Sequence, residues 1–185
     1  GSEMCIRDRV PIRPDVVDCM VFWTKNPIPM MDELEILEPY PYYFQFTLTG
    51  YGRDVEPRLP DKRKVLIPAF QKLAKKLGPD RMVWRYDPVF INSRYTVSYH
   101  LKAFGEIARA LEGCTDQVVI SFLDFYRGME KPMGELGAAL PGRTEMGELA
   151  GEMSRMAAEA GMRTASCAEA FDLSAWGVHL SLIHI

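Results

Sequence analysis

The amino-acid sequence predicts an α/β fold: an incomplete, TIM-like β/α barrel of about five parallel strands with alternating helices. Three observations lead to this prediction. Apolar runs that end in polar residues alternate with segments of helical periodicity. These runs lie far enough apart for a crossover helix, since a parallel connection takes about a dozen residues or more. The second run is polar on one face, as a strand that lines a barrel interior can be.

Each of the five expected strands is an apolar run bounded by polar or turn-forming residues. They comprise residues 16–23, 42–49, 81–87, 117–124 and 162–167.

The second expected strand decides between two architectures. Gln45, Thr47 and Thr49 alternate with apolar residues at the period of two that a strand imposes. In a doubly wound sheet helices cover both faces, so its strands are apolar on both faces, whereas a barrel strand can direct polar groups toward a site at the rim. We therefore expect a barrel. Because a full barrel has eight strands in about 250 residues, we expect a curved, open sheet that lacks some three strands.

Three expected helices each have an apolar stripe that ends before a glycine suited to a left-handed cap. The stripes comprise Leu66, Ala69, Phe70, Leu73 and Leu77 before Gly78; Leu101, Phe104, Ala108 and Leu111 before Gly113; and Leu149, Met153, Met156, Ala157 and Ala160 before Gly161. Pro68 should begin the regular helix or kink it, because its ring excludes a hydrogen bond to the preceding turn.

The composition is that of one soluble globular domain, with 185 residues, of which 48% are hydrophobic and 25% charged. No run approaches the roughly 18 apolar residues that span a membrane. The net charge of −3 does not favour nucleic acid, although binding to it stays an alternative. The basic residues between positions 62 and 76 are expected on a solvated helix face. Cys5 lies among the first nine residues. The other cysteines, Cys19, Cys114 and Cys167, lack the spacing of a metal site or disulfide framework, which favours a reducing cytoplasm.

The two ends of the chain can be encoded by opposite strands of one short DNA duplex. This reciprocity relates residues 180–185 to residues 4–9. We expect residues 1–9 and 180–185 to be adapter-like artefacts and residues 10–179 to be a partial β/α barrel domain of a longer protein. A Gly-Ser cloning remnant with an ordinary apolar tail is the alternative.

Parallel strands bring their carboxyl ends to one rim, where barrel enzymes place functional groups. The expected catalytic residues are Lys25, Arg85 and Asp87, and the expected cofactor- or substrate-binding residues are Asn26, Gln45, Thr47, Thr49, Ser121, Asp124 and Glu169. Arg85 and Asp87 share one face of a strand, so they could serve a ligand or simply compensate each other's charge. Lys25 follows an aromatic-rich strand, where it could be a nucleophile, a base or a fixed cation.

Three other features have structural interpretations. Two glycines around Tyr51 are expected to permit a tight turn rather than to hold a phosphate. Cys167 has no paired histidine and is expected to be a small buried residue. His100 lies within an expected helix as a structural histidine, and no metal site is expected in this chain.

Several strand ends resemble those of a known family, the one catalogued as domain of unknown function 1848. The matching stretches are residues 14–19, 22–27, 42–52, 84–88, 121–122 with Asp124 and Tyr126, and 167–169. The resemblance implies a barrel-type fold and a cysteine cluster near the carboxyl end, similar to that of radical S-adenosylmethionine enzymes, where three thiolates hold a [4Fe–4S] cluster. This chain has no closely spaced cysteines. The cluster and S-adenosylmethionine are therefore implied for the full-length protein, and neither is expected to be bound by this chain.

Three functions follow as alternatives. In the first, the rim of a radical S-adenosylmethionine-like iron–sulfur protein binds the cofactor and an unknown small substrate, while the cofactor performs the difficult chemistry. In the second, a lyase or aldolase uses Lys25 as a Schiff-base lysine and Asp87 to move protons. In the third, the protein is a non-catalytic nucleic-acid or ligand-binding module. The chain alone is expected to be inactive.

Overall fold

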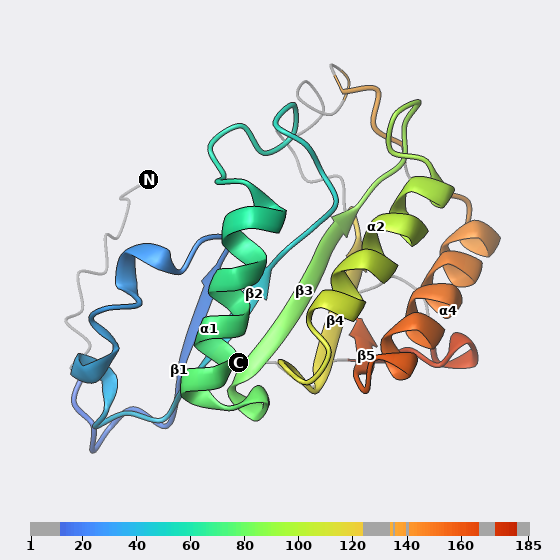
Figure 1. The fold of residues 1–185 in the computed structure, drawn as a ribbon. Helices are drawn as coiled ribbons and strands as arrows, with labels where there is room; N and C mark the ends of the chain where they lie inside the picture. Colours follow the sequence, from blue (N-terminus) through green and yellow to red (C-terminus); the bar gives the residue numbers. More distant parts are fainter. Residues whose placement is uncertain (1–11, 124–133, 135, 140, 167–172, 181–185) are drawn as a thin grey trace, which may run out of the picture.

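The computed structural model describes residues 12–123, 134, 136–139, 141–166 and 173–180. They form one six-stranded sheet in which neighbours in the sheet are also neighbours along the chain (Figure 1). Every pair of adjacent strands is parallel. In order, the strands are β1 (Met20–Thr24), β2 (Tyr42–Thr47), β3 (Met82–Val89), β4 (Gln117–Phe122), β5 (Arg163–Ser166) and β6 (His179–Leu180).

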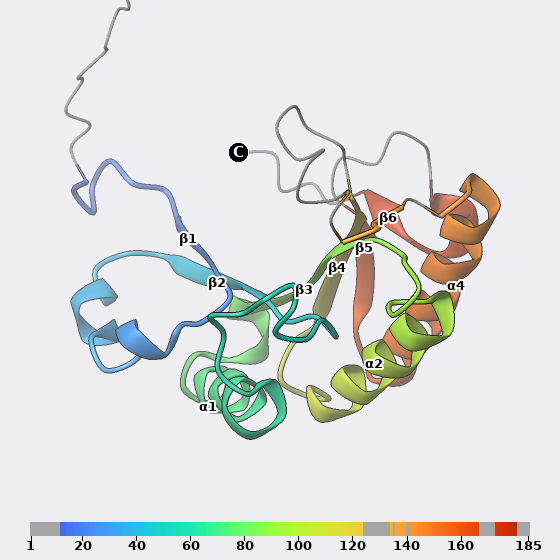
Figure 2. The same ribbon diagram turned by 90° about the horizontal axis from the view of Figure 1, so that it is seen from above.

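The long helices lie together on one side of this sheet (Figure 2). They are α1 (Ile67–Leu77), α2 (Val97–Ala110) and α4 (Arg143–Glu159). Short helical segments flank them: η1 (Ile28–Met30), η2 (Leu34–Leu37), η3 (Lys62–Leu66), η4 (Pro79–Arg81) and η5 (Ser174–Trp176). The sheet curves, with these helices on its outer side.

This arrangement confirms the α/β class and the parallel, alternating order. A doubly wound sheet reverses its strand order at a switch point and carries helices on both faces, and the described part of this chain does neither. Sequential parallel strands with helices on one side are the arrangement found within a β/α barrel.

Except at the start of the first strand, the predicted strand ends lie within two residues of the observed ends, and one short strand was not predicted. The first strand begins at Met20 rather than at Val16, because Val16 N–H donates to the Arg13 carbonyl at 3.0 Å in a turn. The two-residue strand β6 was not predicted. It pairs with β5, and so short an element has no period that sequence analysis could detect.

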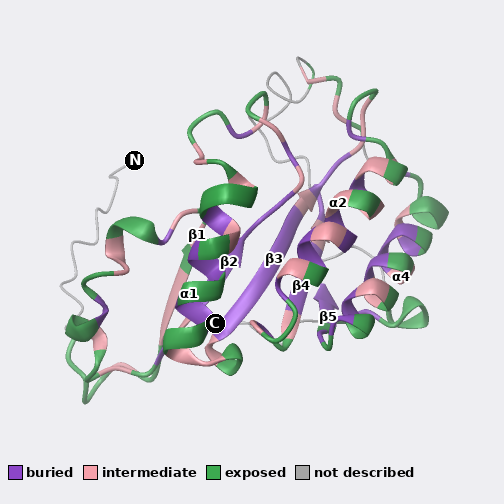
Figure 3. Ribbon diagram, viewed as in Figure 1, coloured by how far each residue is buried: buried purple, intermediate pink, exposed green. Residues whose placement is uncertain are grey.

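The main core fills the space between the sheet and the helices (Figure 3). Phe46 of β2 stacks on Phe70 of α1 with ring centroids 5.2 Å apart, and Trp84 of β3 stacks on Phe104 of α2 at 4.7 Å. The predicted helix stripes supply the opposing residues, since nearly all of their members belong to this core or pack against it.

The helix ends follow their sequence signals. Pro68 lies in the first turn of α1, where its missing N–H costs no helical hydrogen bond, so it begins the regular helix. The preceding segment η3 is capped by Asp61, whose Oδ1 accepts from Lys64 N–H at 2.7 Å. Gly113 and Gly161, which follow α2 and α4, have the positive φ that the predicted caps require. Gly78 ends α1 with φ 98° and ψ 151°, which lies outside the left-handed helical region of the predicted cap.

The opposite face of the sheet is polar at one side and apolar at the other. Across it, Trp23 of β1 pairs with Gln45 of β2, and Gln45 pairs with Val83 of β3. The next row toward the carboxyl ends comprises Thr47, Arg85, Val119 and Ala165. The polar groups are therefore concentrated on β1 to β3, on the face away from α1, α2 and α4.

Candidate functional site

Arg85 and Asp87 form a buried ion pair along one face of β3. Strand alternation puts both side chains on the same face, and they are only 4% and 7% exposed. Arg85 Nε donates to Asp87 Oδ2 at 3.0 Å, and Nη2 donates to the same oxygen. Arg85 Nη1 also donates to Gln45 Oε1 at 2.8 Å. Each buried charge thus has a partner of opposite sign or a polar acceptor, as burial demands.

Trp23 of β1 covers this pair from across the intervening strand β2. The guanidinium carbon of Arg85 lies 4.2 Å from the centre of the indole ring, a cation–π contact. The indole N–H donates to Thr47 Oγ1 at 3.2 Å, and Thr47 in turn donates to Asp87 Oδ1 at 3.4 Å. We call these five residues (Trp23, Gln45, Thr47, Arg85 and Asp87) the inner-face network.

A second group of charges surrounds Glu56, in the segment that follows β2. Lys25 Nζ lies 2.6 Å from Glu56 Oε1, and Lys62 Nζ pairs with Oε2. Thr49 Oγ1 donates to Oε2 at 2.9 Å. The Glu56 side chain is 5% exposed, so the carboxylate is enclosed by its partners. We call Lys25, Thr49, Glu56 and Lys62 the Glu56 cluster.

The two lysines keep Glu56 ionised. Burial raises the pKa of Glu56, but hydrogen bonds from Lys25 and Lys62 and their positive charges outweigh it, so the pKa lies below its ordinary value. Burial lowers the pKa of Lys62, and the bond and charge of Glu56 oppose that change. Two ammonium groups therefore share one carboxylate.

The basic residues between positions 62 and 76 were expected on a solvated helix face, but Lys62 is largely buried. Its ammonium is held by the Thr49 carbonyl at 2.9 Å, Thr49 Oγ1 at 3.1 Å and the Tyr51 carbonyl at 2.6 Å, besides Glu56. The side chain is 18% exposed, whereas that of Arg63 is 79% exposed. The segment between β2 and α1 folds back over Lys62, which helical periodicity does not reveal.

The two groups are continuous through β2. Thr47 belongs to the inner-face network and Thr49 to the Glu56 cluster, and they are two residues apart along one extended segment. Leu48 N–H donates to the Arg85 carbonyl at 2.9 Å, which keeps this segment beside β3 beyond the end of β2. Lys25, Thr47, Thr49, Arg85 and Asp87 are thus brought together, as predicted from the parallel strand ends.

The arrangement of Lys25 suits a fixed cation. An ionised carboxylate 2.6 Å away stabilises the charged ammonium, whereas a nucleophilic lysine must be neutral. The side chain is also 45% exposed, so water reaches the ammonium group. The catalytic roles of Lys25, Arg85 and Asp87 stay predictions.

The other expected binding residues are less closely connected. Asn26 shapes the turn after β1: its Oδ1 accepts from Ile28 N–H at 3.2 Å, and its own N–H donates to Thr24 Oγ1 at 3.0 Å. Ser121 is half-buried on the same face of β4 as Val119. Asp124 and Glu169 lie outside the described residues, as does Cys167.

The structural interpretation of His100 is correct. The ring is fully buried in α2, its Nδ1 lies 2.9 Å from the Tyr86 hydroxyl, and its Nε2 lies 2.9 Å from the Phe90 carbonyl. Because a carbonyl can only accept, Nε2 carries the proton and Nδ1 accepts from Tyr86. Burial lowers the pKa of His100 despite the bond to Phe90.

The glycines around Tyr51 serve close packing. A Cβ at Gly50 would lie 2.7 Å from the Ala103 Cβ of α2. Tyr51 is buried against Phe90 and Tyr95, and its hydroxyl donates to the Pro88 carbonyl at 2.9 Å and accepts from Phe90 N–H at 3.0 Å. The predicted turn begins at Gly52, whose carbonyl accepts from Val55 N–H at 3.1 Å.

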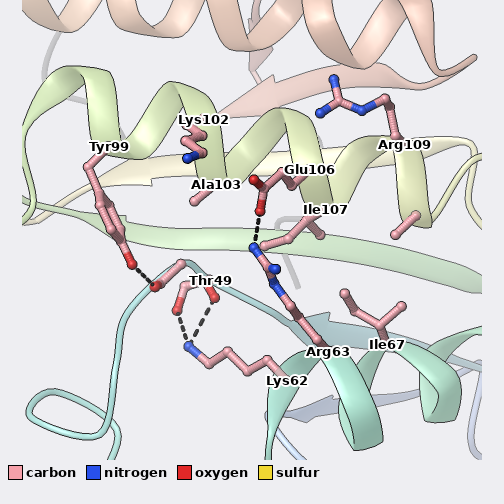
Figure 4. Close-up of a pocket in the computed structure, with 12 residues that line it drawn as sticks. Thr49, Lys62, Arg63, Ile67, Tyr99, Lys102, Ala103, Glu106, Ile107 and Arg109 are labelled. Carbon is pink, nitrogen blue, oxygen red and sulfur yellow. Dashed lines mark hydrogen bonds and ion pairs between the residues drawn. The ribbon is translucent and has the colours of Figure 1, made fainter.

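A groove of about 640 Å³ lies between the start of α1 and α2, on the helix side of the sheet (Figure 4). It touches the Glu56 cluster through Thr49 and Lys62. The exposed ion pair of Arg63 and Glu106 crosses it. The inner face is the candidate functional site, because buried charges converge there, whereas the charges along the groove are screened by solvent.

The described residues contain no group of three His, Cys, Asp or Glu side chains placed to hold a metal ion. Their two cysteines, exposed Cys19 and partly buried Cys114, are not joined in a disulfide. Within the same part of the chain, no helix is long and apolar enough to cross a membrane.

Fold and site together define a class: β/α proteins with a polar site on the face of a parallel sheet that faces away from its helices. The chain belongs to the family described as domain of unknown function (DUF1848), whose model matches residues 4–182. The resemblance found at the strand ends is thereby confirmed. Comparison with curated proteins found no match.

Proposed function

We propose that the inner-face network and the Glu56 cluster form the ligand-binding site of a radical S-adenosylmethionine-like enzyme that acts on a small molecule. The observation that carries this proposal is the burial of Arg85 and Asp87 on the sheet face away from the described helices. Burying an ion pair gains little stability over apolar residues of the same volume, so its presence supports a role in recognition.

The location supports the same proposal. Parallel β/α proteins place ligands at the carboxyl ends of their strands, and Lys25, Thr49 and Asp87 each lie within two residues of such an end. The network is also preorganised: Asp87 and Gln45 hold the guanidinium of Arg85, so a bound ligand meets groups that are already oriented.

The described residues do not fit a [4Fe–4S] cluster. Such a cluster requires three thiolates close together, but Cys19 precedes β1 and Cys114 follows α2. We therefore assign the thiolate ligands of the cluster to the full-length protein. Cytoplasmic localisation is part of the proposal.

The polar residues do fit S-adenosylmethionine as a ligand. Thr47 and Thr49 would hold its hydroxyl groups and Asp87 its amino group, because these side chains supply the matching donors and acceptors. With a cluster, this cofactor supplies one-electron chemistry that protein side chains lack. The residues of this chain bind the ligands, orient them and keep water from the buried ion pair.

The test uses the full-length gene product, reconstituted anaerobically with iron and sulfide. We expect a coloured protein that cleaves S-adenosylmethionine, with cleavage reduced about 10-fold or more by Asp87→Asn, because this variant frees the guanidinium of Arg85. Glu106→Gln, at an exposed ion pair, is the matched control and should retain activity. A colourless protein without cleavage would contradict the proposal, and borohydride trapping of a carbonyl compound on Lys25 would support the lyase instead.

A further inference from the structure

The indole of Trp23 is fixed on one side and open on the other. One face lies over the guanidinium of Arg85 at 4.2 Å, and the ring N–H is bound to Thr47 Oγ1 at 3.2 Å. The residue is nevertheless 64% exposed. Because its inner face and its N–H are occupied, the exposed area includes the outer face of the ring. A large apolar ring held rigidly in this way can stack with a planar partner at little cost in entropy.

Lys25 offers a positive charge on the same side of β1. It lies two residues after Trp23, and strand alternation puts both side chains on one face, about 7 Å apart along the chain. Of its three ammonium N–H groups, one is used by Glu56 Oε1, the only acceptor for Lys25 among the described residues. Lys62, by contrast, has acceptors at Thr49, Tyr51 and Glu56.

The charges of the Glu56 cluster do not balance. Lys25 and Lys62 contribute two positive charges, and Glu56 contributes one negative charge. The half-exposed ammonium of Lys25 is therefore the point at which a further anion is attracted.

We infer that Trp23 and Lys25 form the substrate subsite, and that the substrate is a planar aromatic ring bearing a carboxylate or phosphate group. The ring stacks on the outer face of the Trp23 indole, and the anionic group binds the free N–H groups of Lys25. This assignment rests on the proposed function, because it requires the inner face of the sheet to be the ligand site. It adds the chemical class of the second ligand, which S-adenosylmethionine chemistry alone does not specify.

The experiment measures binding to the full 185-residue chain by equilibrium dialysis with five probes. Adenosine 5′-monophosphate and nicotinate carry both a ring and an anion, adenosine and nicotinamide carry the ring alone, and ribose 5-phosphate carries the anion alone. We expect one of the two aromatic anions to bind at least about 10-fold more tightly than its neutral counterpart and than ribose 5-phosphate. Which of them binds distinguishes a phosphate from a carboxylate.

Three variants locate the binding site. Trp23→Leu should raise the Kd of the aromatic anion about 5-fold or more, while Trp23→Phe, which keeps a stacking ring, should retain most of the affinity. Lys25→Met should raise the Kd of the aromatic anion about 10-fold and leave the Kd of its neutral counterpart unchanged. Trp176→Phe, at a second exposed tryptophan that packs against α4, is the control and should have no effect.

The inference is overturned if neither aromatic anion binds at millimolar concentration, or if Trp23→Leu folds and binds as tightly as the parent. Lys25→Met provides an independent test if Trp23→Leu does not fold, since the Lys25 side chain is half-exposed. S-adenosylmethionine is dialysed in parallel. If it alone binds and Trp23→Leu abolishes that binding, the indole serves the cofactor, so the substrate assignment fails while the proposed function stands.

Discussion

Arg85 Nε lies 3.0 Å from Asp87 Oδ2, two residues further along β3 on the same face. Neither side chain can leave this pairing without exposing a buried charge, because each is less than a tenth exposed. The pair therefore sets the position of the guanidinium beneath Trp23 and of the carboxylate beside Thr47.

Replacing Asp87 by Asn should strongly destabilise the protein. The substitution keeps the shape of the side chain but leaves Arg85 buried without a counter-charge, which costs about 3 kcal/mol or more. Urea unfolding measures the change. Asp15→Asn, at the exposed ion pair with Arg13, is the matched control and should cost less than about 1 kcal/mol. Equal losses for the two variants would mean that the buried pair is solvated.

Glu56→Gln should also destabilise the chain, by about 3 kcal/mol at neutral pH, because Lys62 would remain buried without its carboxylate. Glu106→Gln, whose partner Arg63 is exposed, should cost less than about 1 kcal/mol. Urea unfolding of both variants at pH 7 separates the enclosed ion pair from the screened one.

The same carboxylate predicts a pH dependence. The pKa of Glu56 in the folded chain lies below its ordinary value of 4.5, so the unfolded state binds the proton more readily. The stabilisation is complete above about pH 4.5 and is lost as pH falls through the folded pKa. Unfolding free energies measured below pH 5 should fall less steeply in Glu56→Gln than in the parent. Parallel curves would mean that Glu56 is not held by its lysines.

Sequence alone could predict most of the fold, because strands and helices have periods that appear in local sequence. The alternation of Gln45 and Thr47 with apolar residues gave the polar face of β2, and parallel strand order then brought it beside Arg85. Glycines and Pro68 marked helix ends through backbone rules that depend on few neighbours.

The missing parts of the site depend on distant contacts. Glu56 lies in a segment without periodicity, and only the folding of that segment onto Lys25 and Lys62 buries its carboxylate. Trp23 was expected only as a strand residue, because its contact with Arg85 crosses two strand spacings. Asn26 was expected to bind a ligand, yet its side-chain oxygen accepts a hydrogen bond from the next turn.

His100 should make stability depend on pH in the range above that of Glu56. Burial keeps the pKa of His100 below its ordinary value of 6.5, so the folded state binds fewer protons than the unfolded state near that pH. Stability is complete above about pH 6.5 and falls with pH until the folded pKa is reached, by up to about 1.4 kcal/mol per unit. His100→Gln should flatten this decline. Tyr86→Phe, which removes only the hydroxyl partner, should be less stable but keep the decline.

Gly50→Ala should destabilise the turn that carries Thr49 into the Glu56 cluster. The new methyl group would lie 2.7 Å from the Ala103 Cβ and 3.2 Å from the Tyr86 hydroxyl, so the turn must move away from α2, at a cost of about 1–3 kcal/mol. Gly134→Ala, at a glycine with open space around its Cβ position, is the control and should change the unfolding free energy little.

The partner in this clash can be identified by compensation. Ala103→Gly alone should cost about 1 kcal/mol, because glycine weakens the interior of α2. In that background, Gly50→Ala should cost less than it does in the parent, since the closest obstructing atom is gone. A double-mutant cycle of urea unfolding measures the coupling. If the two costs simply add, Ala103 does not limit the approach of the turn, and the position of Thr49 beside Lys62 must be maintained by the Glu56 cluster alone.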